Sequence, residues 1–488
     1  MQARHSNSDD IRINHVLNGL RPPIAVKTLP PVRWNIMERM ETLNVPGVSI
    51  AVIDNGQLSW TREIGIKEAG TDSPVTTSTL FQVASISKPV AASAVLRLVE
   101  AGELLLDEDV NRYLKSWRIL ENSFTSREKV TLRRILSHSA GLTVSGFPGY
   151  VPGEPLPALR KILDGEKPAN SPAIMVDTTP GFLCRYSGGG FTILQQLLID
   201  TTGESFPSLM KRLVLDPVGM TLSTYEQPLN KSRHNKAASG HDSKGMVIKG
   251  RRNTYPEMAA AGLWTTPTEM SEWILDISGA LEGKPSKLLS KPMVEQMLTL
   301  QSAPPGSGIA FQFGLGLGLE GEGSSFSFAH GGSNRGFLST FVMYPSLGKG
   351  AVVMTNADRG GTLFNEVLQS IAAEYNWPSR TQIEREAANL STGQLDYLVG
   401  RYVAVNPPLL HNVPHACEVT REGGQLVVEM EVYSLFDKEL YPVKIEIYPR
   451  NSESFFTTGG LDIQFTRNSS GQTSAIEIVG VELSRQRT

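Results

Sequence analysis

Residues 80–110, LFQVASISKPVAASAVLRLVEAGELLLDEDV, constrain the fold of this chain more than any other stretch. From Val90 to Val99 apolar residues recur at i, i+4 and i+8 with apolar neighbours, which predicts a helix with a wide buried stripe. Pro89 fits the first helical turn, where its missing N–H costs nothing, and Gly102 can end the helix. A helix of this kind has to lie inside a core.

Ser85 and Lys88 stand one helical turn apart at the head of this helix. Side chains three residues apart share a helix face, so the lysine amine can reach the serine hydroxyl. A serine hydroxyl needs a base to act as a nucleophile near neutral pH. Burial and the positive end of the helix dipole both favour the neutral amine that a base requires. The alternative is a helix start with an ordinary surface lysine, and the S-x-x-K motif alone does not decide between them.

The chain has 488 residues, which predicts two or three domains. Residues 1–32 are polar and end in the Pro-rich stretch RPPIAVKTLPP, which indicates a tail and a linker. Residues 33–385 begin with a hairpin, VSIAVI and QLSWTREIG around DNG, and continue through helical pieces broken by Gly/Pro loops at about 116–265. A helix follows Trp264, with Thr266 or Thr268 as N-cap.

The rest of this body reads as strands followed by a helix, TLFNEVLQSIAAEYN. The expected strands are GIAFQFGLGLGLE, SFSFAHGG, GFLSTFVMYP and GKGAVVMTNA. Apolar residues alternate with the glycines of GLGLGLEGEG and no helix follows them, so a strand running into a hairpin is favoured over a phosphate loop. These patterns predict an α/β body into which a mostly helical region is inserted.

Residues 391–488 form a second kind of sequence, with short alternating strands joined by polar and Gly-rich turns. The strands expected are QLVVEMEV, KELYPVKIEIYP, SFFTT, LDIQFTR and SAIEIVGVEL. This pattern predicts an all-β antiparallel module, a small barrel or half-barrel.

Two further motifs carry chemistry. In PGFLCRYSGGGF, Tyr186 precedes a predicted helix, where it can shuttle protons beside a lysine or simply pack as an aromatic ring. In FAHGGSNRGF, His330, Gly331 and Gly332 end a strand. The glycines there let a substrate approach the backbone, whose N–H groups can form an oxyanion hole, or they make a tight turn.

In this order and spacing, the three motifs resemble the serine β-lactamase and penicillin-binding-protein superfamily, in particular its class C lactamase, esterase and D-aminopeptidase branch. The resemblance covers about residues 33–385 and includes the flanks FQVASISK, LDEDVNRYL, LRRILSHSAGL and AAAGLWTTPTEM. It implies a β-lactamase/transpeptidase-like fold of class α/β (α+β), a three-layer sandwich in which an antiparallel sheet is flanked by helices and carries an inserted helical region. The C-terminal module resembles the lipocalin-like appendage of some of these hydrolases.

The resemblance also implies roles for individual residues. Ser85 is acylated, Lys88 is its general base, and Tyr186 completes the proton relay. His330, with Gly331 and Gly332, stands where many members have K-T-G. The backbone N–H groups of Ser85 and Ser333 form the oxyanion hole, and the mechanism needs no metal or cofactor.

Two departures from the family pattern bear on the substrate. Gly188 replaces the asparagine whose amide often holds an acylamino group, and His330 replaces a lysine whose charge helps bind a β-lactam carboxylate. Both favour an esterase or peptidase over an efficient β-lactamase. Arg335 is either a replacement anion contact or a surface residue.

The remaining candidates are weaker. His138 is expected to be structural rather than catalytic, and Trp264 and Tyr150 either line a cleft or pack in the core. The pair His241–Asp242, and His411 with His415, lack the spacing of a zinc site. Cys184 and Cys417, the two cysteines of the chain, form no metal or disulfide pattern and are expected to be buried.

Composition limits the partners. The net charge of −3 gives no reason to expect nucleic acid, and no stretch approaches the roughly 18 apolar residues of a membrane span. A small-molecule or peptide substrate is expected, with the oligomeric state left open, a homo-oligomer included. The N-terminus has no apolar core of signal-peptide length, which predicts a cytoplasmic protein as written, or a periplasmic or secreted one if a leader was removed.

The sequence and the resemblance therefore predict an S-x-x-K serine hydrolase of the esterase or D-stereospecific peptidase type, which acts through an acyl-serine intermediate on an ester or a small peptide amide. A β-lactamase and an acyl-transferring or peptide-cyclising enzyme are the alternatives within this class. A penicillin-binding or scaffold protein that kept the fold without catalysis is the alternative outside it.

Overall fold

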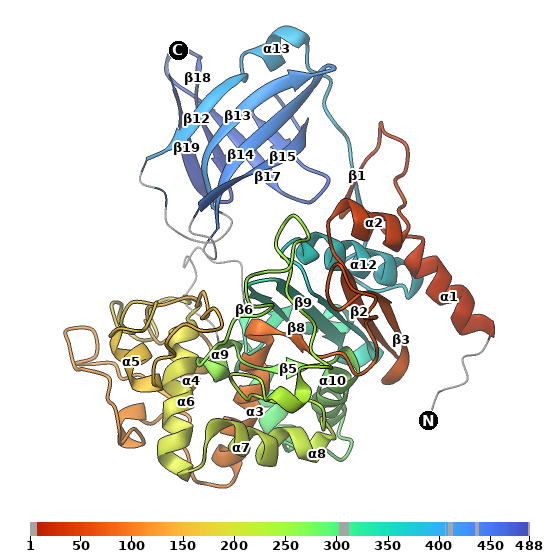
Figure 1. The fold of residues 1–488 in the computed structure, drawn as a ribbon. Helices are drawn as coiled ribbons and strands as arrows, with labels where there is room; N and C mark the ends of the chain where they lie inside the picture. Colours follow the sequence, from red (N-terminus) through yellow and green to blue (C-terminus); the bar gives the residue numbers. More distant parts are fainter. Residues whose placement is uncertain (1–6, 302–311, 406, 408–412, 435–438, 487–488) are drawn as a thin grey trace. The chain divides into compact units, whose positions relative to one another are not determined.

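The computed structural model describes residues 7–301, 312–405, 407, 413–434 and 439–486. They divide into two compact units, one built on residues 37–364 and the other on residues 11–36 and 365–486 (Figure 1). The first unit carries all the predicted site residues and the second carries the predicted barrel.

An antiparallel sheet organises the first unit, with the strand order β3-β2-β10-β9-β8-β7-β6. All eight residues of β2 are buried, as expected of the apolar run VSIAVI, and Asn55 and Gly56 turn the chain into β3 with positive φ angles of 53° and 70°. This confirms the predicted antiparallel sheet. The strands are β2 (Gly47–Asp54), β3 (Gln57–Gly65), β6 (Gln312–Phe313), β7 (Gly318–Glu320), β8 (Ser327–Asn334), β9 (Phe337–Tyr344) and β10 (Lys349–Thr355).

Helices pack against this sheet, and 11 of the 14 residues of α3 are buried. The predicted helix begins at Ser87, has Pro89 in its first turn, and is followed by Gly102 in the left-handed region. Helix α10 packs on β2, β3 and β10, and its N-cap is Thr266, whose hydroxyl accepts from Glu269 N. The helices between residues 36 and 364 are α2 (Ile36–Thr42), α3 (Ser87–Glu100), α4 (Leu132–Leu136), α5 (Leu159–Asp164), α6 (Gly188–Thr202), α7 (Phe206–Met210), α8 (Asp216–Val218), α9 (Met258–Ala261), α10 (Pro267–Leu281) and α11 (Lys291–Met297).

The glycine-rich stretch differs from the single strand predicted for it. In its described part, β6 and β7 are short and antiparallel, and residues 314–317 turn between them. A Cβ on Gly314 would lie 2.2 Å from Met297 O, and one on Gly316 2.8 Å from Ala92 Cβ. The turn packs so closely on α11 and α3 that these two positions exclude side chains.

The second unit contains a closed eight-stranded antiparallel barrel, β12 to β19, which the pairing of β12 with β19 closes (Figure 1). Its interior is filled by apolar side chains such as Tyr402 and Phe465. The sequence missed β12 and β13, and it read β18 and β19 as one strand, although Val479 and Gly480 turn the chain between them. The strands are β12 (Gly400–Ala404), β13 (Pro414–Glu422), β14 (Gln425–Ser434), β15 (Glu439–Pro449), β16 (Ser454–Phe456), β17 (Asp462–Arg467), β18 (Thr473–Ile478) and β19 (Val481–Arg485).

The N-terminal segment, predicted as a tail and linker, is instead folded where the structure describes it. Helix α1 (Asn7–Leu17) buries Ile13 and Val16, and strand β1 (Ile24–Val26) pairs in parallel with β11 (Ile383–Arg385). Its isolated apolar residues stand at helical spacing, so they suffice for one buried face. The unit also contains most of α12 (Gly360–Glu374) and α13 (Thr392–Asp396). None of the helices in the described residues has the length and apolar character to cross a membrane.

Candidate active site

Ser85 lies in a short 3₁₀ helix, η1 (Ala84–Ile86), between strand β4 (Phe81–Gln82) and α3. Ala84, directly before it, has a φ of 48°, a left-handed conformation that a residue with a side chain adopts at a cost. Ser87 stabilises this turn, because its hydroxyl donates to Ala84 O (2.5 Å) and accepts from Leu263 N (2.9 Å). The sequence predicted both motif residues at the head of one helix, whereas Ser85 occupies the turn before it.

Lys88 points from the first turn of α3 back to this serine. Its Nζ lies 2.8 Å from Ser85 Oγ and 2.8 Å from the carbonyl oxygen of Ala260. Only 2% of the residue is exposed, and burial lowers the pKa of the amine from 10.5 to about 7. Near neutral pH, a large fraction of Lys88 is therefore the free amine that a general base requires, and the reading as a surface lysine is wrong.

Tyr186 completes a compact group with these two residues. It precedes the N-cap of α6, Ser187, whose hydroxyl accepts from Gly190 N (3.0 Å). Lys88 Nζ lies 4.9 Å from the centre of the Tyr186 ring. Burial raises the pKa of Tyr186, and a hydrogen bond with the Ser85 side chain offsets part of this rise. Tyr186 is thus a protonated phenol at neutral pH, in contact with Ser85.

His330 stands beside Tyr186 on β8, with the two ring centres 6.2 Å apart. Its Nδ1 donates to Gly331 O (2.6 Å), which leaves Nε2 as the acceptor nitrogen of the neutral ring. Burial and the nearby Lys88 lower the pKa of His330 to about 4. The residue is therefore uncharged at neutral pH, and its buried Nε2 has no hydrogen-bond partner among the described residues.

The two glycines after His330 lie where β8 passes the nucleophile turn. A Cβ on Gly332 would lie 2.1 Å from Val83 O and 3.1 Å from Ser85 N, so only glycine fits. Strand β7 pairs with β8 no further than Ala329, and this edge of β8 is next to the turn. Gly331 and Ser333 are exposed. The backbone around Ser333 is thus near the nucleophile and free of strand pairing on that side.

His138 contacts the tyrosine, which the sequence did not predict. It is 2% exposed, its ring centre lies 4.3 Å from that of Tyr186, and its Nδ1 accepts from Ser187 N (3.1 Å). Its carbonyl also accepts from Arg185 N (2.8 Å). Burial, Lys88 and His330 all lower the pKa of His138. His138 is therefore a neutral side chain that positions the Tyr186 turn.

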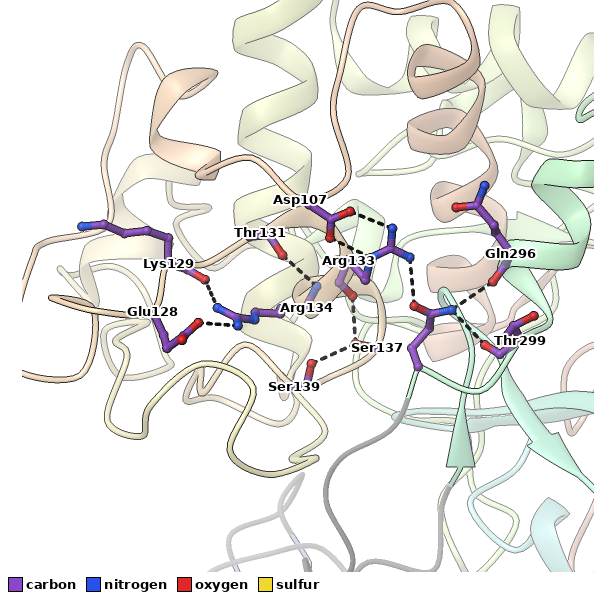
Figure 2. A network of polar contacts seen from close by, with 11 residues as sticks. Asp107, Glu128, Lys129, Thr131, Arg133, Arg134, Ser137, Ser139, Gln296 and Thr299 are labelled. Carbon is purple, nitrogen blue, oxygen red and sulfur yellow. Dashed lines mark hydrogen bonds and ion pairs between the residues drawn. The ribbon is translucent and has the colours of Figure 1, made fainter.

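Polar contacts hold α4 and the turn from which His138 comes (Figure 2). The Arg133 guanidinium makes two hydrogen bonds to Asp107, at 2.7 and 2.8 Å. Ser137 Oγ donates to Arg133 O (2.8 Å) and lies 2.9 Å from Ser139 Oγ. These bonds fix the chain on both sides of His138, whose φ of 57° is in the left-handed region.

Arg335 has a partner that the sequence did not foresee. It pairs with Asp358 (2.5 Å), and the same carboxylate accepts from Gly336 N (2.6 Å). The Arg335 side chain is 17% exposed. The turn between β8 and β9 folds the guanidinium onto Asp358, so Arg335 is not a plain surface residue, and its contact with a substrate anion stays a prediction.

The other candidates are structural. Both ring nitrogens of His241 bond to backbone, Nδ1 to Asn356 O and Nε2 to Ala69 N, and His415 stacks on Tyr433. His411 lies outside the described residues. Four further side chains are buried: Trp264, Tyr150, Cys184 and Cys417.

The residues that sequence reasoning missed are those whose role depends on long-range contacts. Ala260 acts through its carbonyl, so no side-chain pattern could have identified it, although AAAGL was recognised as a flank. Phe191 and Phe313 contact the site as aromatic neighbours of His138. Two buried amides, Gln82 and Asn334, also carry no signal in the sequence that would have singled them out.

Comparison with known proteins settles the family. The family model described as Beta-lactamase matches residues 32–375, more than half of the chain. The chain belongs to the beta-lactamase family. The match includes all the site residues described above and ends before the barrel.

Curated relatives are distant. The chain is 24% identical over 239 residues to Protein flp of Staphylococcus aureus (strain N315), and 29% identical over 187 residues to penicillin-binding protein 4 of Amycolatopsis lactamdurans. These alignments cover 47% and 38% of this chain, and 45% and 46% of the relatives. The chain thus spans about half the length of the curated relatives it matches.

Solved structures share the fold. The octameric penicillin-binding protein homologue from Pyrococcus abyssi has a TM-score of 0.61 at 20% identity, covering 92% of this chain and 98% of that one. SurE with D-Leu has a TM-score of 0.57 at 20% identity, covering 92% and 97%. A beta-lactamase/D-alanine carboxypeptidase from Yersinia pestis, complexed with citrate, has a TM-score of 0.55 at 20% identity, covering 70% and 97%. The first two of these structures cover 92% of this chain, which is more than the family match at residues 32–375.

The space beside Gly188 gives a first prediction. A Cβ there would lie 3.1 Å from both Phe147 Cε2 and Ser145 O. A side chain at this position therefore requires the loop at residues 145–147 to move by a few tenths of an ångström. Gly188→Asn is expected to destabilise the fold by about 1–3 kcal/mol through overpacking. Urea unfolding measures this, with Gly146→Asn as the control, since nothing lies within 4 Å of a Cβ at Gly146. A Gly188→Asn variant as stable as the control would show that the loop leaves room for an amide.

Proposed function

We propose that this chain is a serine hydrolase that acts through an acyl-Ser85 intermediate on an ester or a small peptide amide. The observation that carries the proposal is the contact of 2.8 Å between Lys88 Nζ and Ser85 Oγ, in a site where burial brings the pKa of the lysine to about 7. A buried amine with this pKa is suited to accept a proton near neutral pH.

In acylation, the neutral Lys88 amine takes the hydroxyl proton of Ser85, and Oγ forms a bond to the substrate carbonyl carbon. The carbonyl electron pair moves to oxygen, where the N–H groups of Ser85 and Ser333 stabilise the charge. Tyr186 then delivers a proton to the leaving alcohol or amine as its bond to carbon breaks, and it recovers one from Lys88. The products are acyl-Ser85, the leaving group and a neutral amine.

In deacylation, water passes a proton through Tyr186 to Lys88 as its oxygen bonds to the acyl carbon. Lys88 then returns a proton to Ser85 Oγ as the acyl bond breaks, which leaves the free acid, the Ser85 hydroxyl and a neutral amine. The acceptor Nε2 of His330, unpartnered among the described residues, is suited to orient the water or the polar end of the substrate. No step of this mechanism uses a metal or a cofactor.

The features around the nucleophile favour esters and small amides over β-lactams. His330 is neutral at pH 7, so the strand carries no permanent cation at this position for the carboxylate of a β-lactam. The guanidinium of Arg335 is paired with Asp358 and does not replace that charge. Gly188 offers no amide for an acylamino group.

Second candidates rest on the relatives. The D-Leu complex of SurE and the D-alanine carboxypeptidase from Yersinia pestis support a preference for D-residues in a peptide amide substrate. β-Lactam hydrolysis, and transfer of the acyl group to an amine in place of water, use the same intermediate. Penicillin binding without turnover is the non-enzymatic alternative. The octamer of the Pyrococcus homologue supports a homo-oligomer.

A substrate panel tests this proposal. Wild-type protein is incubated with p-nitrophenyl acetate and butyrate, D-alanyl and L-alanyl p-nitroanilides, and a chromogenic cephalosporin. We expect turnover of the esters or an anilide at least about 10²-fold faster than cephalosporin hydrolysis, because no permanent cation faces the lactam carboxylate. Faster turnover of the cephalosporin would overturn the substrate assignment. A mass adduct with fluorescent penicillin and no turnover of any substrate would favour the binding protein.

A further inference from the structure

Three segments that are distant in the sequence meet at the nucleophile. They are the turn that carries Ser85, the end of β8 that carries Ser333, and residues 260–261, where Ala260 O accepts from Lys88. The proposed mechanism assigns no residue to hold these three segments at a fixed distance from one another. The contact at Gly332 is a close approach of backbones and supplies no hydrogen bond between side chains.

One side chain links β8 to residues 260–261 and to the strand just before the turn that carries Ser85. Asn334 Nδ2 donates to Gln82 Oε1 (3.1 Å) and to the carbonyl oxygen of Ala261 (3.1 Å). Gln82 precedes Ser85 by three residues, and its own Nε2 donates to Asn253 O (2.7 Å). Both side chains are fully buried, with exposures of 1% and 0%. The two N–H groups of the asparagine amide are both used, and each reaches a different segment.

These hydrogen bonds lie close along the chain to both N–H groups of the oxyanion hole. Asn334 follows Ser333 directly, and side chains alternate along a strand, so Asn334 shares a face of β8 with Gly332, which touches the turn. Gln82 belongs to β4, which pairs with β5 (Trp264–Thr265), and Val83 N donates to Leu263 O (3.1 Å). The amide pair thus joins β8 to the strand that leads directly into the nucleophile turn.

We propose that Asn334 and Gln82 are positioning residues that set the distance between the two N–H groups of the oxyanion hole. The inference rests on the proposed function, because it assigns these groups to Ser85 and Ser333. Donors of an oxyanion hole stabilise the transition state only when they are within hydrogen-bond distance of the charge that develops. Asn334 is one residue from the donor Ser333, and Gln82 is three residues from the donor Ser85. This buried amide pair therefore controls the distance between the donors without touching the substrate.

The test replaces Asn334 by aspartate, an isosteric change that removes both N–H donors, and Gln82 by methionine, which has similar length and no acceptor oxygen. The readouts are kcat and KM for the best ester of the panel, and the rate at which an alkyl fluorophosphonate labels Ser85. We expect kcat and the labelling rate to fall together, on the order of 10- to 100-fold, with KM changed less than about threefold. In the Gln82→Met variant, which adds no charge, the pH midpoint of kcat/KM, set by Lys88, stays in place.

Asn111→Asp is the matched control. Asn111 also bridges two backbone groups with its amide, Nδ2 to Ile119 O (2.9 Å) and Oδ1 to Ile119 N (2.9 Å), and it lies outside the groups that form the site. It is expected to lower stability and leave kcat and labelling unchanged. If Asn334→Asp does not fold, Gln82→Met alone tests the positioning role.

Folded Asn334 or Gln82 variants that keep the wild-type kcat and labelling rate would overturn the positioning role, even with lowered stability. Absence of labelling in the wild-type protein would instead overturn the proposed function, so the two failures are distinct.

Discussion

Ser85→Ala is expected to abolish ester or amide hydrolysis, with kcat reduced on the order of 10⁵- to 10⁶-fold. In the proposed mechanism, Ser85 supplies the atom that forms the acyl bond, and Lys88, 2.8 Å away, takes the proton from this hydroxyl. The residual rate comes from substrate binding and the oxyanion hole. Initial rates at enzyme concentrations high enough to detect this residual activity measure the loss.

The fold should survive this change. Ser85 is half-buried, and its replacement removes the hydrogen bonds of its side chain with Lys88 and Tyr186, each of which contributes about 1 kcal/mol to stability. Ser93→Ala, on the helix α3 that follows, is the control, since the Ser93 hydroxyl accepts from Trp273 Nε1 (3.0 Å) in the core. This control should lose stability and keep activity. A Ser85→Ala variant with wild-type rates would assign the reaction to another residue.

Lys88→Met is expected to lower kcat/KM on the order of 10³- to 10⁴-fold, because the site loses its general base. In the wild-type protein, kcat/KM should rise with pH to a plateau, with a midpoint near the lysine pKa of about 7, since only the free amine accepts a proton. His330, with a pKa of about 4, is neutral throughout this range. The variant should lack the midpoint near 7. Rate profiles from pH 5 to 9 measure both effects.

Lys88→Met should raise the stability of the fold, although it lowers activity. An unfolded lysine titrates near 10.5 and the folded one near 7, so the unfolded state binds more protons between these values. Native stability therefore rises with pH across this window, and below pH 7 the buried ammonium imposes its full cost. Lys88→Met removes this cost, and the gain at pH 6 should be on the order of 2 kcal/mol after the unpaired Ala260 carbonyl is subtracted.

The gain should shrink as the pH approaches 10. Urea unfolding at pH 6 and pH 9.5 measures it, with Lys249→Met, an exposed position, as the control. An active Lys88→Met variant, or one with the same stability difference at both pH values, would contradict the assignment of a buried, readily neutralised base.

Local patterns predicted much of the site. The spacing of Ser85 and Lys88 on an apolar-striped helix, the tyrosine before a helix start and the histidine at a strand end are properties of short segments, and the structure brings these residues together. The sheet and the C-terminal barrel followed from period-two patterns and turn residues in the same way.

What the sequence missed depends on contacts between distant segments. The Ala260 carbonyl and the Asn334 amide become important only where the chain folds back on α3. Arg335 could not be assigned without knowing that Asp358 lies beside the β8–β9 turn. The helix at residues 7–17 was read as a tail because few apolar residues mark it, and they gain their burial from partners far along the chain, such as the segment around Ser370.

The most direct test of the central claim is the intact mass of the wild-type and Ser85→Ala proteins after treatment with an alkyl fluorophosphonate at pH 8. The reagent loses fluoride as it bonds to an activated serine oxygen, so it reports the Ser85–Lys88 pair whatever the natural substrate is. We predict one phosphonyl group per wild-type chain, located on Ser85 by peptide mapping, and none on Ser85→Ala. An unmodified wild-type protein, or equal labelling of both proteins, would contradict an activated serine at this site.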